Sequence, residues 1–467
     1  MCISLAISGT LVDTSLYEIL EDIICERVHG TGHRDDKCKD TGVQTQLSSL
    51  MGGLQAAMMV PGLVLTVPYG ALADRYGRVK ILGLSLLGIT LYMASMAVVC
   101  ARPDVFSLKL IWLSPAFQVI GGGTMVANPM LYATVADIVT DEQRSSAFMY
   151  IGSLVMAGSL VARPITYLAM SRSAWFAMWL GIAWLGITTV LAFCIPETLN
   201  VQAAVETDPV AVETPPDGKS PVLRFIATAR AYVTKTFKTI RWLFWEQRLV
   251  GFLLVGLTFE TLGKLAQLVS PQYISKRYKL SYSKVNLLQS IDTVTVLVLL
   301  LCILPVAGHL LTTKLRLSAR EKDLRLAQGS AVVAALGTLV IATADKMSLL
   351  VVGMVTFNLG GGYTYLLRGL MTSLVAGHSI GLLYSCIAFV DTIIFMVAPL
   401  LYAWLFNVGL GQGDAWIGLP YLVGGGILVA AAVLVGLIRA SFVDDVGTGG
   451  EGDEEEGEAG EESTGVR

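Results

Sequence analysis

The feature that most constrains the fold is a short charged segment, GALADRYGR, at residues 70–78. Asp74, Arg75 and Arg78 are its charged residues, and it lies between two long apolar runs at residues 47–69 and 79–100. Each run is long enough to cross a bilayer, which takes about 20 apolar residues. Charged groups are costly in the hydrocarbon core, so we expect this segment at a membrane face, joining two spanning helices.

The composition supports an integral membrane protein. Of the 467 residues, 54% are hydrophobic and 15% are charged, and the mean hydropathy is +0.65. A soluble domain has roughly 25% charged residues. The apolar runs lack the period-two alternation of a barrel strand, so helices are the expected spanning element.

The sequence argues against several classes of function. No catalytic constellation or phosphate-binding loop occurs, so we do not expect an enzyme, and no cofactor or metal site is predicted. The basic residues lie in short loops between apolar runs, which argues against nucleic-acid binding. The expected partners are the lipid bilayer, a small-molecule substrate and protons, with the chain acting as a monomer.

Eleven segments are apolar and long enough to span a membrane. They are residues 47–71, 79–100, 108–135, 147–170, 175–195, 249–271, 286–308, 328–344, 348–372, 380–405 and 419–438. A twelfth candidate, residues 1–20, has an apolar part of only about a dozen residues, and Asp13 interrupts it. We expect it to be the C-terminal half of a helix whose start is missing; the alternative is a short or tilted first helix. The predicted total is therefore about 11–12 spans.

The loop charges predict an orientation. The positive-inside rule assigns the more basic set of loops to the cytosol. That set contains the 70–78 segment, Arg144, residues 314–325 and Arg368, although the basic residues 276–284 lie on the other side and count against it. With twelve helices the C-terminus is cytosolic, and we expect the plasma membrane rather than the vacuole.

The chain is expected to consist of two six-helix halves, residues 1–197 and 247–440. Residues 198–246 form a linker whose second part alternates basic and apolar residues, which favours an amphipathic helix on the anionic cytoplasmic leaflet. Residues 441–467 form an acidic disordered tail. An internal repeat supports the division, because FQVIGGGT at residues 117–124 echoes TFNLGGGY at residues 356–363.

The 70–78 segment resembles the loop motif of the major facilitator superfamily, which joins transmembrane helices 2 and 3. That resemblance implies two parallel six-helix halves and a gating role for Gly70, Asp74, Arg75, Gly77 and Arg78. Asp137, Arg144 and Glu197 resemble the family's charge motifs after helices 4 and 6, and with Arg78 they could form one ion network. The alternative for all of them is ordinary topogenic or exposed charge.

Other stretches are similar to a group of fungal members of this superfamily. They are YEILEDIIC at residues 17–25, QYISKR at residues 272–277, LSAREKDL at residues 317–324 and GLP at residues 418–420. The drug-antiporter motif of helix 5 is not met, because Arg163 stands where a glycine precedes the proline. That departure puts proton-antiport drug efflux in doubt for this chain.

Ionisable residues inside predicted spans are candidates for proton or substrate binding. Glu260 and Lys264 are four residues apart, so they share a helix face and can pair; the alternative is a structural ion pair. Asp391 is the most central lone acid and the preferred proton carrier, because burial favours the neutral form of a carboxyl group. Asp292 is either another candidate or a polar cap. Arg163 could attract an anionic substrate or neutralise one of the acids.

Cys25 and Cys38 share the polar loop at residues 21–45. If that loop is exoplasmic, a disulfide between them can form; otherwise both are free thiols. Taken together, the sequence predicts a secondary transporter working by alternating access, exporting a metabolite or xenobiotic with proton coupling. The alternatives are a nutrient uptake symporter, or a non-transporting or inactive truncated membrane protein.

Overall fold

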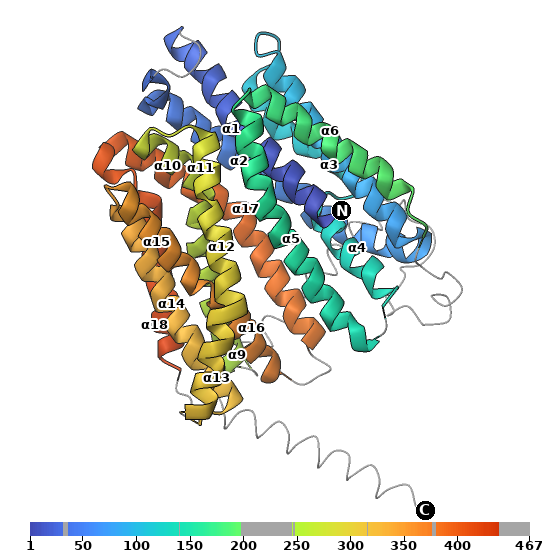
Figure 1. Cartoon of the computed structure of the whole chain (residues 1–467), viewed down its shortest axis with the longest axis vertical. Coiled ribbons are helices and arrows are strands. Elements are labelled where there is room, and N and C mark those ends of the chain that lie inside the picture. The colour runs from blue at the N-terminus through green and yellow to red at the C-terminus, as the bar shows by residue number, and fades with distance from the viewer. Residues whose placement is uncertain are drawn as a thin grey trace, which may run out of the picture. The chain divides into compact units, whose positions relative to one another are not determined.

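The computed structural model is built from helices (Figure 1). It describes residues 1–30, 36–139, 141–197, 245, 248–314, 316–375 and 380–438. Within these ranges there is no β-strand, and twelve helical segments are long and apolar enough to cross a membrane. The predicted linker at residues 198–246, including its amphipathic second part but apart from residue 245, and the acidic tail at residues 441–467 lie outside the described residues.

The chain divides into two compact units. Unit 1 holds residues 1–231, 268–293 and 395–417, and unit 2 holds the remainder. This division differs from a simple cut at the linker. Segments after the linker, including α10 (Ser270–Tyr278) and α11 (Tyr282–Leu288), pack with the first six spans.

Unit 1 contains the long helices before the linker. They are α1 (Cys2–His29), α2 (Thr41–Tyr76), α3 (Arg78–Ala101), α4 (Thr124–Ala136), α5 (Asp141–Met170) and α6 (Ala174–Phe193), with the short helices η1 (Asp36–Lys39) and η2 (Leu108–Val119). The C-terminal part of α17 (Ile380–Gln412), followed by η7 (Asp414–Trp416), also belongs to it. Helix α1 contacts α5 and α6, and α3 contacts α6 and α4.

Unit 2 is built mainly from the helices after residue 293. They are α13 (Leu304–Lys314), α14 (Ala319–Thr343), α15 (Met347–Leu359), α16 (Tyr363–Ser373), the first part of α17, and α18 (Leu419–Gly436), together with α9 (Arg248–Lys264). The short segments η4 (Leu299–Ile303) and η5 (Gly360–Gly362) also belong to unit 2. The short segments η3 (Leu265–Val269) and α12 (Ser290–Val298) are each divided between the two units along the chain. Helix α18 contacts both α9 and α14.

Helix α1 is longer than the sequence pattern suggested. It runs for 28 residues, or about 42 Å at 1.5 Å per residue, and so includes residues 21–29, which we had assigned to a polar loop. Ile24 and Cys25 are buried on it, and Glu21 is paired with a lysine, so packing stabilises this polar end as a helix. Its length is sufficient to cross the hydrocarbon core.

The two glycine triplets of the internal repeat lie where helices approach each other closely. Gly121, Gly122 and Gly123 all have positive φ and break the fourth span between η2 and α4. A Cβ on Gly121 would meet the backbone of α3, and one on Gly360 would meet the backbone of α14 at Ala334. The second triplet stays helical, so the two copies share a packing role and differ in conformation.

Candidate functional site

A network of charges surrounds the turn between α2 and α3 in unit 1. Gly77 has φ of +112°, which ends α2 and lets α3 start in a new direction. The carboxylate of Glu197 accepts hydrogen bonds from the backbone N–H groups of Arg78 (2.9 Å), Val79 (3.2 Å) and Lys80 (3.4 Å). Glu197 therefore caps the N-terminus of α3, where unpaired N–H groups and the helix dipole favour a negative charge.

The same turn is tied to the end of α4. Arg78 Nη1 lies 2.5 Å from Asp137 Oδ1 and also donates to the carbonyl of Ala133. The guanidinium of Arg75 lies 5.5 Å from the ring centroid of Tyr76. The structure thus brings Arg78, Asp137 and Glu197 into the single network that the motifs predicted. The side chains of Asp74 and Arg144 lie outside the described residues.

A second group of charges lies inside the spans of unit 2. Glu260 and Lys264, one turn apart on α9, form an ion pair, and the Glu260 side chain is only 1% exposed. Thr364 on α16 donates to both Glu260 oxygens at 3.0 and 3.1 Å, and Lys264 Nζ lies 3.0 Å from the Thr364 hydroxyl. Glu260 is therefore buried, paired with Lys264 and hydrogen-bonded to Thr364.

Asp391 on α17 is paired with an arginine, Arg368, that was counted with the loop charges although it lies inside the predicted span at residues 348–372. Arg368 Nη2 lies 2.7 Å from Asp391 Oδ2, and Arg368 belongs to the membrane-length segment Met347–Ser373. The structure therefore places Arg368 on a helix, inside the predicted span at residues 348–372, rather than in a loop. Asp391 also hydrogen-bonds with the Thr261 side chain and interacts electrostatically with Glu260.

These four ionisable residues form a balanced cluster, which we call the unit 2 charge cluster: Glu260, Lys264, Arg368 and Asp391. Two carboxylates and two cations give no net charge when all are ionised. Asp391 keeps 17% and Arg368 35% of its side-chain surface exposed, in contrast to Glu260. Asp391 and Arg368 are therefore accessible at the surface of unit 2, whereas Glu260 is not.

Arg163 and Asp292 lie together in unit 1. Arg163 Nη1 donates to the Asn286 carbonyl (3.2 Å) and lies 3.3 Å from Gln289 Oε1, while the Asn286 amide donates to the Arg163 carbonyl (3.1 Å). Arg163 also interacts electrostatically with Asp292. These contacts join α5 to α11, so the Arg163 side chain has neighbours that position it.

Near the C-terminal end of α1, a disulfide joins this helix to η1. The structure bonds Cys25 to Cys38, with Cα atoms 5.1 Å apart. We call the part of unit 1 around this bond the disulfide end, and the part around residues 70–78 the motif end.

Asp13 on α1 was not predicted as a site residue; the sequence suggested only that it interrupts the first span. It interacts electrostatically with Tyr17, one turn further along α1, and with Tyr92 on α3. Thr364 and Arg368 were also missed as site residues. Their spacing of four residues, which puts them on one helix face, is the signal that could have identified them. Within the described ranges, no group of three or more His, Cys, Asp or Glu side chains could hold a metal ion.

Comparisons with known proteins show the family to which this chain belongs. A family model described as Major Facilitator Superfamily matches residues 39–390. The MFS efflux pump atnC of Emericella nidulans is 28% identical over 92% of this chain and 84% of its own length. The MFS-type transporter avaK of Aspergillus versicolor is 27% identical over 90% and 87%.

Solved structures agree at the level of the fold. The nucleoside transporter NupG superposes with a TM-score of 0.61 at 12% identity, over 93% of this chain and 98% of its own. A POT family peptide transporter gives a TM-score of 0.59 at 13% identity, over 95% and 96%. On the match of the family model and this common fold, the chain belongs to the Major Facilitator Superfamily of membrane transporters.

Proposed function

We propose that this transporter exports a small organic molecule by alternating access and couples the export to proton entry. One of the fungal relatives, atnC, is named as an efflux pump, which supports export as the direction. We further propose that the disulfide end faces the exoplasmic side, because disulfides persist in oxidising compartments. The motif end and the C-terminus would then be cytosolic, in the plasma membrane.

The observation that carries the proposal is the unit 2 charge cluster. Charged side chains inside membrane spans are costly and are retained mainly where they carry out transport. Here two acids interact with each other as well as with two cations, so a proton bound by either acid would remove a repulsion. Asp391 is the accessible acid of the two, and it remains our candidate for the proton carrier.

Protonation of Asp391 would change the cluster in two ways. It would release Arg368 from the 2.7 Å ion pair, and it would leave a net charge of +1 in a low-dielectric region. That state is unfavourable until water or a ligand reaches Arg368. Proton binding would therefore favour a conformational change that opens the cluster to the other side of the membrane.

The network around Gly77 is the proposed gate of unit 1 at the motif end. Glu197 and Asp137 hold the α2–α3 turn and the end of α4 by hydrogen bonds that also neutralise Arg78. Contacts of this kind contribute about 1–3 kcal/mol each. They are strong enough to bias one state and weak enough to be broken during a transport cycle.

Arg163 is proposed as a positioning residue that holds α5 against α11. Its hydrogen bonds with Asn286 and Gln289 favour this role over direct capture of an anionic substrate. Asp292 would supply a nearby negative charge.

The test is transport in proteoliposomes. Full-length protein is reconstituted, an inside-acid or inside-alkaline pH gradient is imposed, and the distribution of a panel of organic cations and neutral aromatic compounds is measured. We expect at least one compound to move against its gradient in the direction opposite to proton flow. Movement in the same direction as protons would support uptake symport, and transport unchanged after the gradient is dissipated would exclude proton coupling.

A further inference from the structure

We propose that Asp13, near the middle of α1, binds the positive charge of the transported molecule, which is therefore an organic cation. This inference rests on the proposed transport of small organic molecules and names their chemical class. Helix α1 runs from Cys2 to His29 and is long enough to cross the hydrocarbon core, so Asp13 lies at membrane depth. An ionisable side chain is costly there and is retained mainly where it serves transport.

Asp13 has no partner of opposite charge in the part of the chain that the structure describes. Its side chain forms no ion pair or hydrogen bond there, and its electrostatic neighbours are Tyr17 and Tyr92. The acids of unit 2 differ, because Glu260 and Asp391 are each paired with a cation of the protein. The carboxylate of Asp13 is therefore the acid whose charge a cationic ligand would balance.

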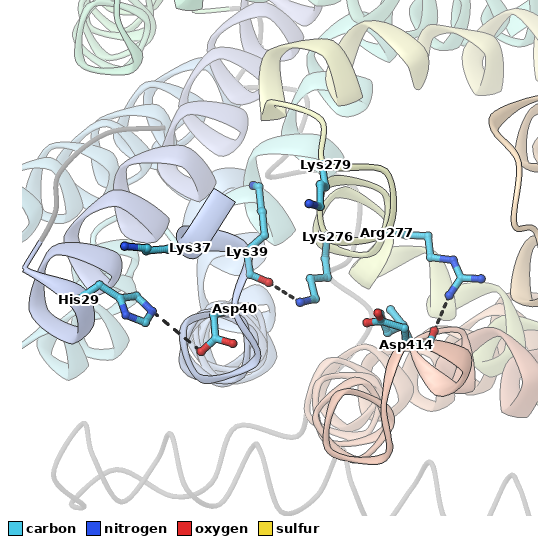
Figure 2. A pocket seen from close by; sticks show the side chains of 9 residues that line it. His29, Lys37, Lys39, Asp40, Lys276, Arg277, Lys279 and Asp414 are labelled. Atoms are coloured by element: carbon cyan, nitrogen blue, oxygen red, sulfur yellow. Dashed lines mark hydrogen bonds and ion pairs between the residues drawn. The ribbon is translucent and has the colours of Figure 1, made fainter. Parts of the chain in front are cut away.

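The cations of unit 1 are occupied elsewhere. Lys39 lies 2.8 and 2.6 Å from the two carboxylate oxygens of Glu21, and Lys276 donates to the Lys39 carbonyl, as Figure 2 shows. Glu21 is eight residues further along α1 than Asp13, which is about 12 Å along the helix axis. Arg163 of α5 donates to oxygens of α11. The protein's own cations therefore leave Asp13 to an external partner.

Asp13 is exposed, although the residues beside it on α1 are buried. Leu11 and Val12 lie against Gly181 of α6, and Ser8 donates to the Gly181 carbonyl at 2.8 Å. Successive residues turn by about 100° around a helix, so Asp13 lies about 200° from Leu11 and away from α6. Ionisable side chains in spans face the protein interior or a water-filled space rather than lipid. The exposed carboxylate is therefore open to water and to a ligand.

Polar groups of three helices lie on this side of α1. Tyr17 hydrogen-bonds with Gln55 of α2, and the Tyr92 hydroxyl of α3 donates to the Met58 sulfur at 3.0 Å. Because the Tyr92 proton is directed to sulfur, it is not donated to Asp13, and the hydroxyl presents its oxygen instead. Met58 is half-buried, and a thioether adapts to ligands of different shape. The surroundings thus favour a positive charge and tolerate an apolar body beside it.

There is open space next to the carboxylate for such a body. Gly9 lies one turn before Asp13 on the same helix face, and a Cβ built on it would meet nothing within 4 Å. A metal ion would need several oxygen ligands. Within the described ranges, no group of three or more His, Cys, Asp or Glu side chains could supply them. A single carboxylate beside open space fits an organic cation better than a metal ion.

The test measures binding of radiolabelled tetraphenylphosphonium, a permanent organic cation, to full-length protein in detergent by scintillation proximity. Wild type is expected to bind it, and Asp13→Asn, which removes only the charge, should weaken binding about tenfold. Asp13→Glu keeps the charge and should retain binding. Asp104→Asn, at an exposed acid of unit 1, is the matched control and should leave binding unchanged.

Two further measurements exclude a merely structural role. Asp13→Asn should unfold at or above the wild-type temperature, because it removes an unpaired charge from a span. Gly9→Leu leaves the charge in place and fills the open space beside it, so it should also weaken tetraphenylphosphonium binding. Binding of the neutral analogue triphenylphosphine oxide should be the same in wild type and Asp13→Asn.

Equal tetraphenylphosphonium affinity in wild type and Asp13→Asn would overturn the proposal, as would the absence of binding to wild type. If Asp13→Asn kept that affinity but lost accumulation of a neutral compound driven by the pH gradient, Asp13 would be a proton site instead. The binding measurement uses no gradient. Its failure therefore leaves proton-coupled export standing, and failure of the gradient experiment leaves cation binding at Asp13 standing.

Discussion

The network around Gly77 and the unit 2 charge cluster both balance acids against cations, but in different surroundings. At Gly77 the carboxylate of Glu197 is held by backbone N–H groups at a helix end, and Asp137 and Arg78 remain partly exposed. In unit 2 the acids lie within membrane spans, and Glu260 is 1% exposed.

Under the proposed function, this difference would give the two groups of charges different roles. A helix end supplies fixed partial charges and access to water, so breaking the Gly77 network costs little. A buried pair has neither, so removing one partner leaves an uncompensated charge. The first arrangement suits a gate that opens in each cycle, and the second suits a site whose charge state controls the cycle.

The largest expected effect comes from breaking the buried pair. Glu260→Gln leaves Lys264 beside a neutral amide, and we expect the free energy of unfolding to fall by about 3–5 kcal/mol. The matched control is Glu321→Gln, which breaks a pair of the same spacing with an Arg325 side chain that is 56% exposed. That control should cost about 0.5 kcal/mol or less. Denaturant titration in detergent measures both, and equal losses would contradict the contrast between buried and exposed pairs.

Gly77→Ala should have the next largest effect. The residue has φ of +112°, where a side chain is strained, and an added Cβ would meet the Glu197 carboxylate that caps α3. We expect a loss of about 2–3 kcal/mol. Gly70→Ala is the control within the same motif, because Gly70 is helical and a Cβ there meets nothing within 4 Å. It should stabilise by up to about 1 kcal/mol, and a loss at Gly70 as large as at Gly77 would refute the role assigned to the turn.

Glu197→Ala should lower the free energy of unfolding by less than Gly77→Ala does. It removes the acceptor for three N–H groups of α3, which we expect to cost about 1–2 kcal/mol, as for loss of an N-cap. Glu197→Gln keeps one acceptor oxygen and should lose less. Thermal unfolding of the two variants in parallel measures the difference. Identical behaviour of Ala and Gln would mean that the hydrogen bonds to α3 contribute nothing.

The smallest effect is expected at the ion pair beside this cap. Asp137→Asn should lower the free energy of unfolding by about 1 kcal/mol, because the pair is partly exposed and Arg78 still donates to the Ala133 carbonyl. Asp104→Asn, at an exposed acid of the same unit, is the control and should have no measurable effect. A loss above about 3 kcal/mol at Asp137 would mean that the network behaves like a buried cluster.

Much of the fold could be predicted from the sequence, because the patterns that indicate it lie within short stretches of the chain. Long apolar runs predicted the membrane-spanning helices, and the 70–78 motif with Asp137 and Glu197 predicted a network that the structure brings together. The pairing of Arg368 with Asp391 was not predicted, because the two residues are 23 positions apart on different helices and only the folded structure reveals their contact. The end of α1 was misread because Glu21 is stabilised by Lys39, a partner beyond the helix.

The central claim is that Asp391 carries the coupling proton, and Asp391→Asn tests it most directly. The variant is assayed in proteoliposomes beside wild type, with a compound that wild type accumulates under an imposed pH gradient. We expect the Asp391→Asn variant to let the compound equilibrate down its own gradient while losing all accumulation driven by the pH gradient. Full accumulation by the variant would contradict the account.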